Sequence, residues 1–344
     1  MRLLLITQKA DKNDPVLGFF HRWIIEFAKH FEEVIVICLW QGVCEFPANV
    51  RVISLGKEEG SSKPKYLRRF YRTIWAERAR YDAVFVHMNQ VYVLLGALLW
   101  KLLGKQVFLW YTHRSVTLSL RAAVILVDKA LTASSESLRI RSKKVTVLGH
   151  GIDTAVFSPT KKASSDSISI VTVGRISPVK RYETLIQAFS EIRSEVPIFL
   201  DIAGAPATRG DESYLASLRA LAAERGVSGR VRFKGAMRHD TIPALLRASD
   251  IFVNMSRTGS VDKAVLEAMS CGVPAVTSNV AFQSMLSPYG LFFKDGDVQE
   301  LARILGSLVG KRDTLTALGA ELRAIVLRDH DLMTLIGRIT NLYE

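Results

Sequence analysis

Residues 168–192 read ISIVTVGRISPVKRYETLIQAFSEI, and this stretch decides the fold of the second half of the chain. Its first six residues are mainly apolar and β-branched, which is typical of a strand buried on both faces of a parallel sheet. Gly174 then permits a tight turn, and a helical spacing of apolar residues begins near Tyr182. A strand, a turn and a helix in this order predict one βα unit of a parallel sheet.

The same alternation of strands and helices fills most of the chain. In the second half we predict strands at 168–173, 198–202, 231–233, 251–253, 275–277 and 291–293, and helices at 182–195, 214–225, 241–248, 264–271 and 298–309. In the first half we predict strands at 3–7, 34–39, 50–55, 83–87, 106–110, 130–133 and 145–148, and helices at 19–31, 66–80, 92–103 and 118–126. The tail after residue 309 is predicted to be helical. These patterns predict an α/β fold of two Rossmann-like, doubly wound lobes.

A polar segment at 158–167 (SPTKKASSDS) separates the two series of strands and is predicted to be a linker. We therefore expect an N-terminal lobe at 1–157 and a C-terminal lobe at 168–328. Doubly wound sheets bind ligands at the carboxyl ends of their strands. Two such lobes facing each other predict an interlobe cleft.

The composition narrows the class of protein. The chain has 344 residues, of which 49% are hydrophobic, so each half can form a core. Its three cysteines form no CxxC pair and indicate a reducing compartment. The first apolar run is too short for a signal peptide, so we expect a cytoplasmic protein. No GxGxxG segment opens a helix, no Gly-Lys pair precedes Ser or Thr, and no His/Cys cluster has zinc spacing.

The longest apolar stretch covers residues 91–103 and is interrupted by Lys101. A membrane-spanning helix needs about 20 apolar residues. We therefore interpret this stretch as a buried helix.

The positive charge is concentrated in the first half of the chain. The net charge is +13, of which residues 1–158 contribute +10 and residues 159–344 contribute +3. The densest run, at 63–80, interleaves basic and aromatic residues, and helical spacing places its apolar side chains on one side. Such a basic amphipathic helix suits an anionic membrane at the inner face, although a solvated helix packed on the sheet has the same pattern. The candidate basic patch comprises Lys65, Arg68, Arg69 and Arg72.

Two segments of the second half carry candidate binding residues. Arg175 and Lys180 follow the strand that ends before Gly174, and two cations there could hold a diphosphate or form an ordinary surface pair. In the second segment, 254–272, a turn leads into a helix with Asp262 as a plausible N-cap. The helix N-terminus suits phosphate or sugar oxygens. Glu267 lies among apolar neighbours and needs a partner, either ribose hydroxyls or a neighbouring Lys or Arg.

Taken together, these segments resemble the family-4 retaining glycosyltransferases of the GT-B fold. The resemblance rests on VGR-x4-K at 173–180, DIAG at 201–204, VxFxG at 231–235, ASDIFV at 248–253 and LEAMSCGxP at 266–274. The first half resembles the family more loosely, in HGID at 150–153 followed by Phe157, which matches the crossing between lobes. A C-terminal helix at 329–344 resembles the family helix that returns to the first lobe.

The resemblance implies roles for individual residues. Arg175 and Lys180 would hold the donor diphosphate and stabilise charge on the leaving nucleotide, while Glu267 would bind the ribose. His113 matches the family's active-site histidine, which makes His113, Arg175 and Lys180 the candidate catalytic residues. Gly18 matches a loop glycine that approaches the phosphates. The remaining candidate donor-binding residues are Gly174, Gly204, Gly235, Gly259, Ser260, Val261, Asp262 and Lys263.

One position departs from the family pattern. The first Glu of the family's Glu-x7-Glu motif would fall at Gly259, in the stretch Gly259-Ser260-Val261-Asp262-Lys263. That Glu normally contacts the hydroxyls of the donor sugar. We consider Asp262 as a replacement carboxylate and Lys263 as a third phosphate contact.

The carboxylates of Asp295-Gly296-Asp297 could be mistaken for a metal-binding DxD motif. They precede a predicted helix, with Glu300 three residues after Asp297, which indicates a capping box. We predict no metal site here, since a lone carboxylate pair lacks further ligands.

The implied reaction is metal-independent sugar transfer with retention at the anomeric carbon. The donor would be a nucleotide-diphosphate sugar, UDP- or GDP-linked, with no other cofactor, and the acceptor a glycan or a lipid-linked sugar of a cell-surface polysaccharide or glycolipid. An epimerase or hydrolase of nucleotide sugars, or a binding protein that has lost activity, would share the same motifs. No recognition motif for nucleic acid accompanies the basic residues.

Overall fold

The computed structural model describes residues 1–14, 16–160, 165–256 and 259–344, and the chain divides into two compact units. The first unit comprises Met1–Gly151 with Asp331–Glu344, and the second comprises Ile152–His330. The structure groups Ile152 and Phe157 with the second unit because both side chains belong to its core. The predicted linker at 158–167 lies partly outside the described residues. The predicted cleft between the units stays a prediction.

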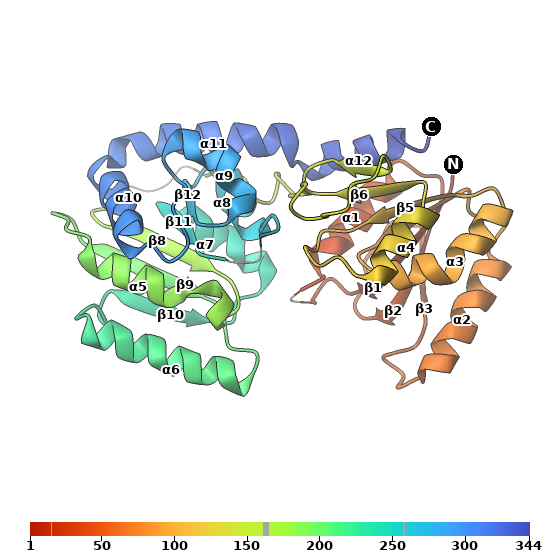
Figure 1. Ribbon diagram of the computed structural model, residues 1–344, viewed down its shortest axis with the longest axis horizontal. Coiled ribbons are helices and arrows are strands. Elements are labelled where there is room, and N and C mark those ends of the chain that lie inside the picture. The colour runs from red at the N-terminus through yellow and green to blue at the C-terminus, as the bar shows by residue number, and fades with distance from the viewer. Residues whose placement is uncertain (15, 161–164, 257–258) are drawn as a thin grey trace. The chain divides into compact units, whose positions relative to one another are not determined.

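The first unit is built on a seven-stranded parallel sheet with the order β3-β2-β1-β4-β5-β6-β7. Its strands are β1 (Leu3–Ala10), β2 (Val34–Gln41), β3 (Val50–Ser54), β4 (Ala83–His87), β5 (Gln106–Trp110), β6 (Lys129–Thr132) and β7 (Val145–Val147). Its helices are α1 (Phe19–Ala28), α2 (Lys63–Ala76), α3 (Gln90–Leu102), α4 (Leu118–Leu126) and the C-terminal α12 (Leu332–Asn341). The helices flank the sheet (Figure 1).

The end of the chain is anchored in this first unit. Helix α12 packs against α1, and just beyond it the buried Tyr343 stacks on Phe108 of β5, with ring centroids 3.8 Å apart. The Tyr343 hydroxyl donates to the carbonyl of Val84 in β4 at 2.8 Å. These contacts tie the C-terminal residues to the central strands.

The prediction that residues 91–103 form a buried helix is correct for the helix and for one of its sides only. Helix α3 buries the side that includes Val93, Ala97 and Trp100, but Leu98 and Leu102 on the opposite side are 73% and 78% exposed. An apolar pattern on every side of a helix gives no period from which its exposed side can be read.

The second unit contains a five-stranded parallel sheet with the order β10-β9-β8-β11-β12. Its strands are β8 (Ile168–Val173), β9 (Ile198–Ala203), β10 (Val231–Gly235), β11 (Ile251–Asn254) and β12 (Ala275–Thr277). Its α-helices are α5 (Tyr182–Glu191), α6 (Arg209–Glu224), α7 (Ile242–Ala248), α8 (Lys263–Ser270), α9 (Gln283–Leu286), α10 (Val298–Gly310) and α11 (Leu315–Asp329). Two parallel sheets flanked by helices confirm the predicted α/β class.

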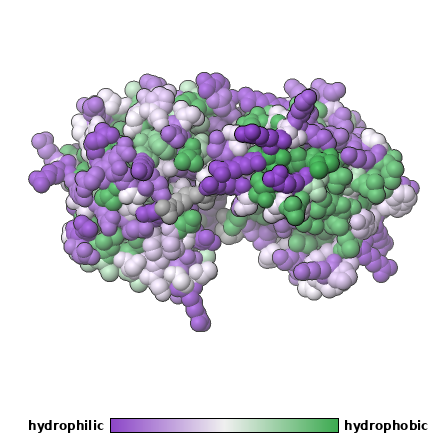
Figure 2. Space-filling model, viewed as in Figure 1, coloured by the Kyte–Doolittle hydropathy of each residue, from purple (hydrophilic) through white to green (hydrophobic). Residues whose placement is uncertain are grey.

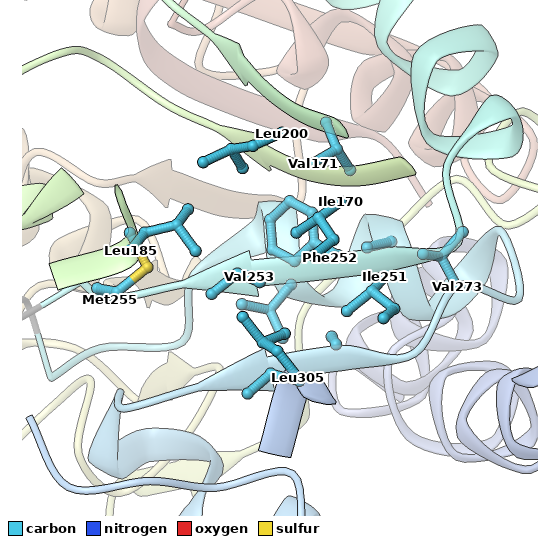
Figure 3. Packing of buried hydrophobic residues seen from close by; sticks show 14 of the residues in the cluster. Ile170, Val171, Leu185, Leu200, Ile251, Phe252, Val253, Met255, Val273 and Leu305 are labelled. Atoms are coloured by element: carbon cyan, nitrogen blue, oxygen red, sulfur yellow. The ribbon is translucent and has the colours of Figure 1, made fainter. Parts of the chain in front are cut away.

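The core of the second unit forms on both faces of the sheet. Helix α5 packs beside α10, and α8 packs beside α11. Figure 3 shows Ile170 of β8 beside Phe252 of β11, and Leu305 of α10 approaching the sheet. Because both faces are covered, the strands are apolar without strict alternation.

The strand predicted at 291–293 is absent. Phe292 forms only an isolated parallel bridge with Thr277, which is too little for a strand. Throughout the described ranges, no helix combines the length and the apolar character needed to cross a bilayer.

Candidate functional site

The order of strands in the second unit creates a switch point between β8 and β11. From β8 the chain moves outward through β9 to β10 and then returns to the other side of β8 as β11. Connections that leave in opposite directions open a crevice at the carboxyl ends of the two strands, where ligands of such sheets bind. The residues at those ends are Gly174 and Asn254, and both predicted binding segments begin there.

Three glycines line the carboxyl edge of this sheet beside the switch point. The amide of Gly174 donates to Ala203 at 2.9 Å, and the amide of Gly204 donates to Gly235 at 2.8 Å. A Cβ on Gly204 would lie 1.9 Å from the carbonyl oxygen of Gly174, so the backbones could not approach with any other residue. No side chain from these positions covers the edge.

Lys180 lies beside the predicted helix cap, 82 residues away in sequence. Its ammonium is 2.7 Å from Oδ2 of Asp262, and both side chains are largely but not fully shielded from solvent. Arg175 is exposed in the loop directly after β8. The structure thus brings Lys180 and Asp262 together and places Arg175 at the edge where β8 ends.

Asp262 caps helix α8, as the sequence indicated. Its Oδ1 accepts from the amide of Ala264 at 3.3 Å, and Oδ2 also accepts from the Asn254 side chain at 3.1 Å. Burial alone would raise the pKa of Asp262, but the charge of Lys180 and these hydrogen bonds outweigh it and hold the pKa below the usual value. The carboxylate is therefore ionised at neutral pH.

Lys263 is the first residue of α8. Burial lowers the pKa of its ammonium to about 8, although the negative charges of Glu267 and Asp262 act in the opposite direction. An ammonium with this pKa is mostly protonated at pH 7. It can therefore add positive charge at a helix N-terminus that already favours anions.

Glu267 lies one turn further along α8 and is buried. Its Oε1 is 3.1 Å from Nε2 of His239, which belongs to a short turn of 3₁₀ helix (His239–Thr241) after β10. The His239 ring contacts Phe157 edge-on, with centroids 5.5 Å apart. Sequence reasoning considered only Lys or Arg as a protein partner of Glu267 and missed His239, because 28 residues separate the two and no spacing links them.

The position of the missing family Glu has an unusual backbone. Gly259 is buried and has a φ of 65°, a left-handed conformation that a side chain disfavours. Two residues further on, Val261 is half-buried against the core, and the carbonyl of Ser260 accepts from the buried side chain of Asn279 at 2.9 Å. The chain here is shaped for glycine, and a glutamate at 259 would be strained.

His113 and Gly18 lie in the first unit, so their predicted place beside the donor stays a prediction. Gly18 precedes α1, and a Cβ there would lie 2.5 Å from the carbonyl oxygen of Asp14, which explains the glycine without a ligand. His113 is exposed after β5, and its Nδ1 accepts from the amide of Ser115 at 3.2 Å.

The members of the predicted basic patch differ in their environments. Lys65, Arg68 and Arg72 are exposed on α2. Arg69 instead pairs with Glu59 at 2.8 Å and donates to the carbonyl of Leu55 at 3.2 Å. Arg69 thus helps to hold α2 on the unit as well as adding charge.

The carboxylates at 295–297 have local partners. Asp297 caps α10 and accepts from the amide of Glu300 at 2.9 Å, while Glu300 accepts from the amide of Lys294. Asp295 lies 3.8 Å from Arg181. Over the part of the chain that is described, no three His, Cys, Asp or Glu side chains gather as metal ligands.

The fold and the sequence of the second unit can both be compared with those of known proteins. Residues 155–323, just under half of the chain, match the model of the family described as Glycosyl transferases group 1, and the fold is GT-B. The HepE protein of Anabaena, solved in complex with UDP, has a TM-score of 0.79 and 19% identity over 99% of each chain. WaaG, a glycosyltransferase involved in lipopolysaccharide biosynthesis, has a TM-score of 0.68 and 13% identity, again over 99% of each chain.

The relatives with named activities match only about half of the chain. The D-inositol 3-phosphate glycosyltransferase of Salinispora tropica is 31% identical over 207 residues, which is 53% of this chain and 42% of that protein. One component of the phosphatidylinositol N-acetylglucosaminyltransferase of Arabidopsis thaliana is 29% identical over 162 residues, 45% of this chain and 35% of that protein. The chain thus spans less than half the length of these relatives.

Proposed function

We propose that the chain is a retaining, metal-independent glycosyltransferase of family 4 that moves a hexosyl group from a nucleotide-diphosphate sugar to a glycan or lipid-linked acceptor. One observation carries the proposal. Lys180, the Asp262 cap, Lys263 and Glu267 gather from two distant segments at the switch point of the sheet that the family model covers. A switch point is where such sheets bind nucleotides.

The site offers complementary groups for each part of a donor. Arg175, Lys180 and the N-terminus of α8 supply positive charge for a diphosphate. Glu267 supplies a buried carboxylate that can accept hydrogen bonds from ribose hydroxyls, while its Oε1 contacts Nε2 of His239. The UDP-bound HepE structure and the sugar transferases among the relatives support a nucleotide sugar, with UDP or GDP as the nucleotide.

In the proposed reaction the bond between the anomeric carbon and the donor phosphate breaks, and its electron pair passes to the phosphate oxygen. Arg175, Lys180 and Lys263 stabilise this developing charge. The acceptor hydroxyl attacks the same face of the sugar and gives its proton to the departing phosphate. The cations thus act on the leaving group, and no carboxylate nucleophile is required.

The acceptor is proposed by class. The relatives named for glycosyl transfer with inositol 3-phosphate or phosphatidylinositol favour a polar hydroxylated acceptor, in soluble or lipid-linked form. A lipid-linked acceptor would fit a protein of the cytoplasm that contacts the inner face of the membrane through Lys65, Arg68, Arg69 and Arg72. Synthesis of a cell-surface polysaccharide or glycolipid is the process that this chemistry serves.

The deciding experiment follows the donor sugar. Purified protein is incubated with UDP- and GDP-sugars labelled in the sugar, with and without a membrane extract or inositol phosphate as acceptor. Transfer predicts acceptor-dependent label in a glycan or lipid together with release of nucleoside diphosphate. Free sugar without acceptor would indicate a hydrolase, and an altered nucleotide sugar an epimerase. Binding without any conversion would indicate a protein that has lost activity.

A further inference from the structure

Helix α3 exposes an apolar face to solvent. Val91, Leu94, Leu98 and Leu102 follow helical spacing along one side and are 47%, 37%, 73% and 78% exposed. The opposite side is buried in the first unit. A soluble helix usually carries polar residues where α3 carries leucines.

Neighbouring helices extend this surface. Helix α4, which packs beside α3, exposes Leu118 (85%) and Ile125 (70%). Helix α2 adds a stripe of half-exposed Leu67, Tyr71 and Trp75, and the Tyr71 hydroxyl donates to the carbonyl of Leu95 in α3 at 3.0 Å. We call the exposed side chains of Leu67, Tyr71, Trp75, Val91, Leu94, Leu98, Leu102, Leu118 and Ile125 the apolar face. Figure 2 shows hydrophobic residues gathered over α3 and α4.

Positive charge surrounds the apolar face. Residues 63–126 contain eleven Lys or Arg and only two acidic residues, a net charge of +9 out of +13 for the chain. The two acids, Glu77 and Asp82, pair with Arg51 and Arg2 from outside this segment, and two of the bases, Arg69 and Arg80, pair with Glu59 and Glu33, also from outside it. Lys101 and Arg121 are exposed on α3 and α4, and neither forms an ion pair with any described residue.

We propose that the apolar face is a docking surface for an anionic lipid bilayer. The exposed side chains of α3 and α4 insert into the boundary between the headgroups and the acyl chains of the contacted leaflet. A 13-residue helix is about 20 Å long and cannot cross a hydrocarbon core of about 30 Å. An apolar helix side flanked by Lys and Arg is the pattern of an interfacial helix. Lys101 and Arg121 then lie at the level of the lipid headgroups, with the exposed basic residues of α2 beside them.

Charge favours a bilayer over a second copy of the chain. A symmetric dimer would place the same surface of each copy against the other. The excess positive charge of residues 63–126 would then oppose itself, whereas anionic headgroups complement it. The surface lies wholly in the first unit, whereas the candidate donor residues at the switch point belong to the second unit.

The test is co-sedimentation of the full chain with lipid vesicles. We expect binding to vesicles of phosphatidylcholine with about 30% phosphatidylglycerol, weak binding to phosphatidylcholine alone, and weakening by salt. The variant Leu98→Ser/Leu102→Ser/Leu118→Ser should lower partitioning at least about tenfold. Lys101→Gln/Arg121→Gln should weaken binding to anionic vesicles only.

The matched control is Val280→Ser/Met333→Ser, whose side chains are 51% and 59% exposed outside the apolar face. It should bind as the unmodified protein does, and thermal melting followed by circular dichroism checks that every variant is folded. Equal pelleting of the triple variant and the unmodified protein would overturn the proposal. So would a dimer in sedimentation velocity that the triple variant dissociates, together with no vesicle binding. Because the assay contains no donor, its outcome is independent of sugar transfer.

Discussion

At the scale of single residues, Asp262 connects the two halves of the candidate donor site. The same carboxylate caps α8 and holds the ammonium of Lys180. Both oxygens are already engaged within the protein. Asp262 therefore acts first by positioning a cation, and a contact with the donor sugar would be an additional role.

Asp262→Asn separates these two functions because asparagine also caps helices well. We expect the cap to remain but the ion pair with Lys180 to be lost, which should cost about 1–3 kcal/mol of stability, while donor turnover falls about tenfold or more as Lys180 loses its partner. Asp262→Ala should in addition lose about 1 kcal/mol of stability with the cap. Urea unfolding and steady-state kinetics measure both effects. Normal turnover in Asp262→Asn would exclude a role in holding Lys180.

The proposed contact between Lys263 and a diphosphate should make nucleotide binding depend on pH. Its ammonium is protonated below its pKa of about 8 and loses its charge above it. A bound phosphate favours the charged form, so the affinity should fall as the pH rises through 8, by at most about tenfold per pH unit. Equilibrium dialysis of nucleoside diphosphate between about pH 7 and 9.5 tests this. Lys263→Gln should bind more weakly with a flatter profile, and an unchanged profile would show that Lys263 does not contact phosphate.

At the scale of elements, Gly174 and Gly204 determine how closely the chain segments that follow β8 and β9 approach each other at the site. Gly204→Ala places a methyl group where the Gly174 carbonyl already lies. We expect a loss of about 1–3 kcal/mol of unfolding free energy from the second unit. Gly229→Ala is the matched control, since a Cβ there meets no atom within 4 Å. If both variants unfold at the same urea concentration, the close approach is not a constraint.

The C-terminal segment should contribute to the stability of the first unit alone. Tyr343→Phe removes the hydrogen bond to Val84 and should cost about 1 kcal/mol. Tyr343→Ala also removes a buried ring and should cost about 3–5 kcal/mol. Hydrogen exchange resolved by segment can check this, because protection should fall in β4 and β5 and remain in β8 and β11. Equal losses in both units would contradict it.

The elements show what a sequence can predict and what it cannot. Strands such as β4, β8 and β12 were predicted with their observed bounds, because apolar runs ended by polar or glycine residues indicate buried strands directly. The exposed side of α3 could not be predicted, since apolar residues surround the whole helix.

The candidate site also contains features that the sequence predicts and features that it cannot predict. Individual residues such as Lys180 and Glu267 were selected by motif, but their partners Asp262 and His239 depend on tertiary structure. The sequence indicated Asp262 only as a helix cap and as a replacement for the missing carboxylate. Pairs separated by 82 and 28 residues leave no local pattern, so the ion pair and the histidine contact needed coordinates.

At the scale of the whole molecule, the two units carry different kinds of surface. The second unit contains the family-matched segment and the cations at its switch point. The first unit carries most of the positive charge and the exposed apolar face. This division favours donor binding by the second unit and engagement of acceptor and membrane by the first.

The second unit should bind a nucleoside diphosphate through Lys180 and Glu267, and isothermal titration calorimetry with UDP and GDP tests this binding most directly. We predict saturable binding of one of the two, weakened at least about tenfold in Lys180→Gln and in Glu267→Gln. The control Arg225→Gln, an exposed cation at the end of α6, should bind normally. No binding of either nucleotide, or the same affinity in all variants, would contradict the claim.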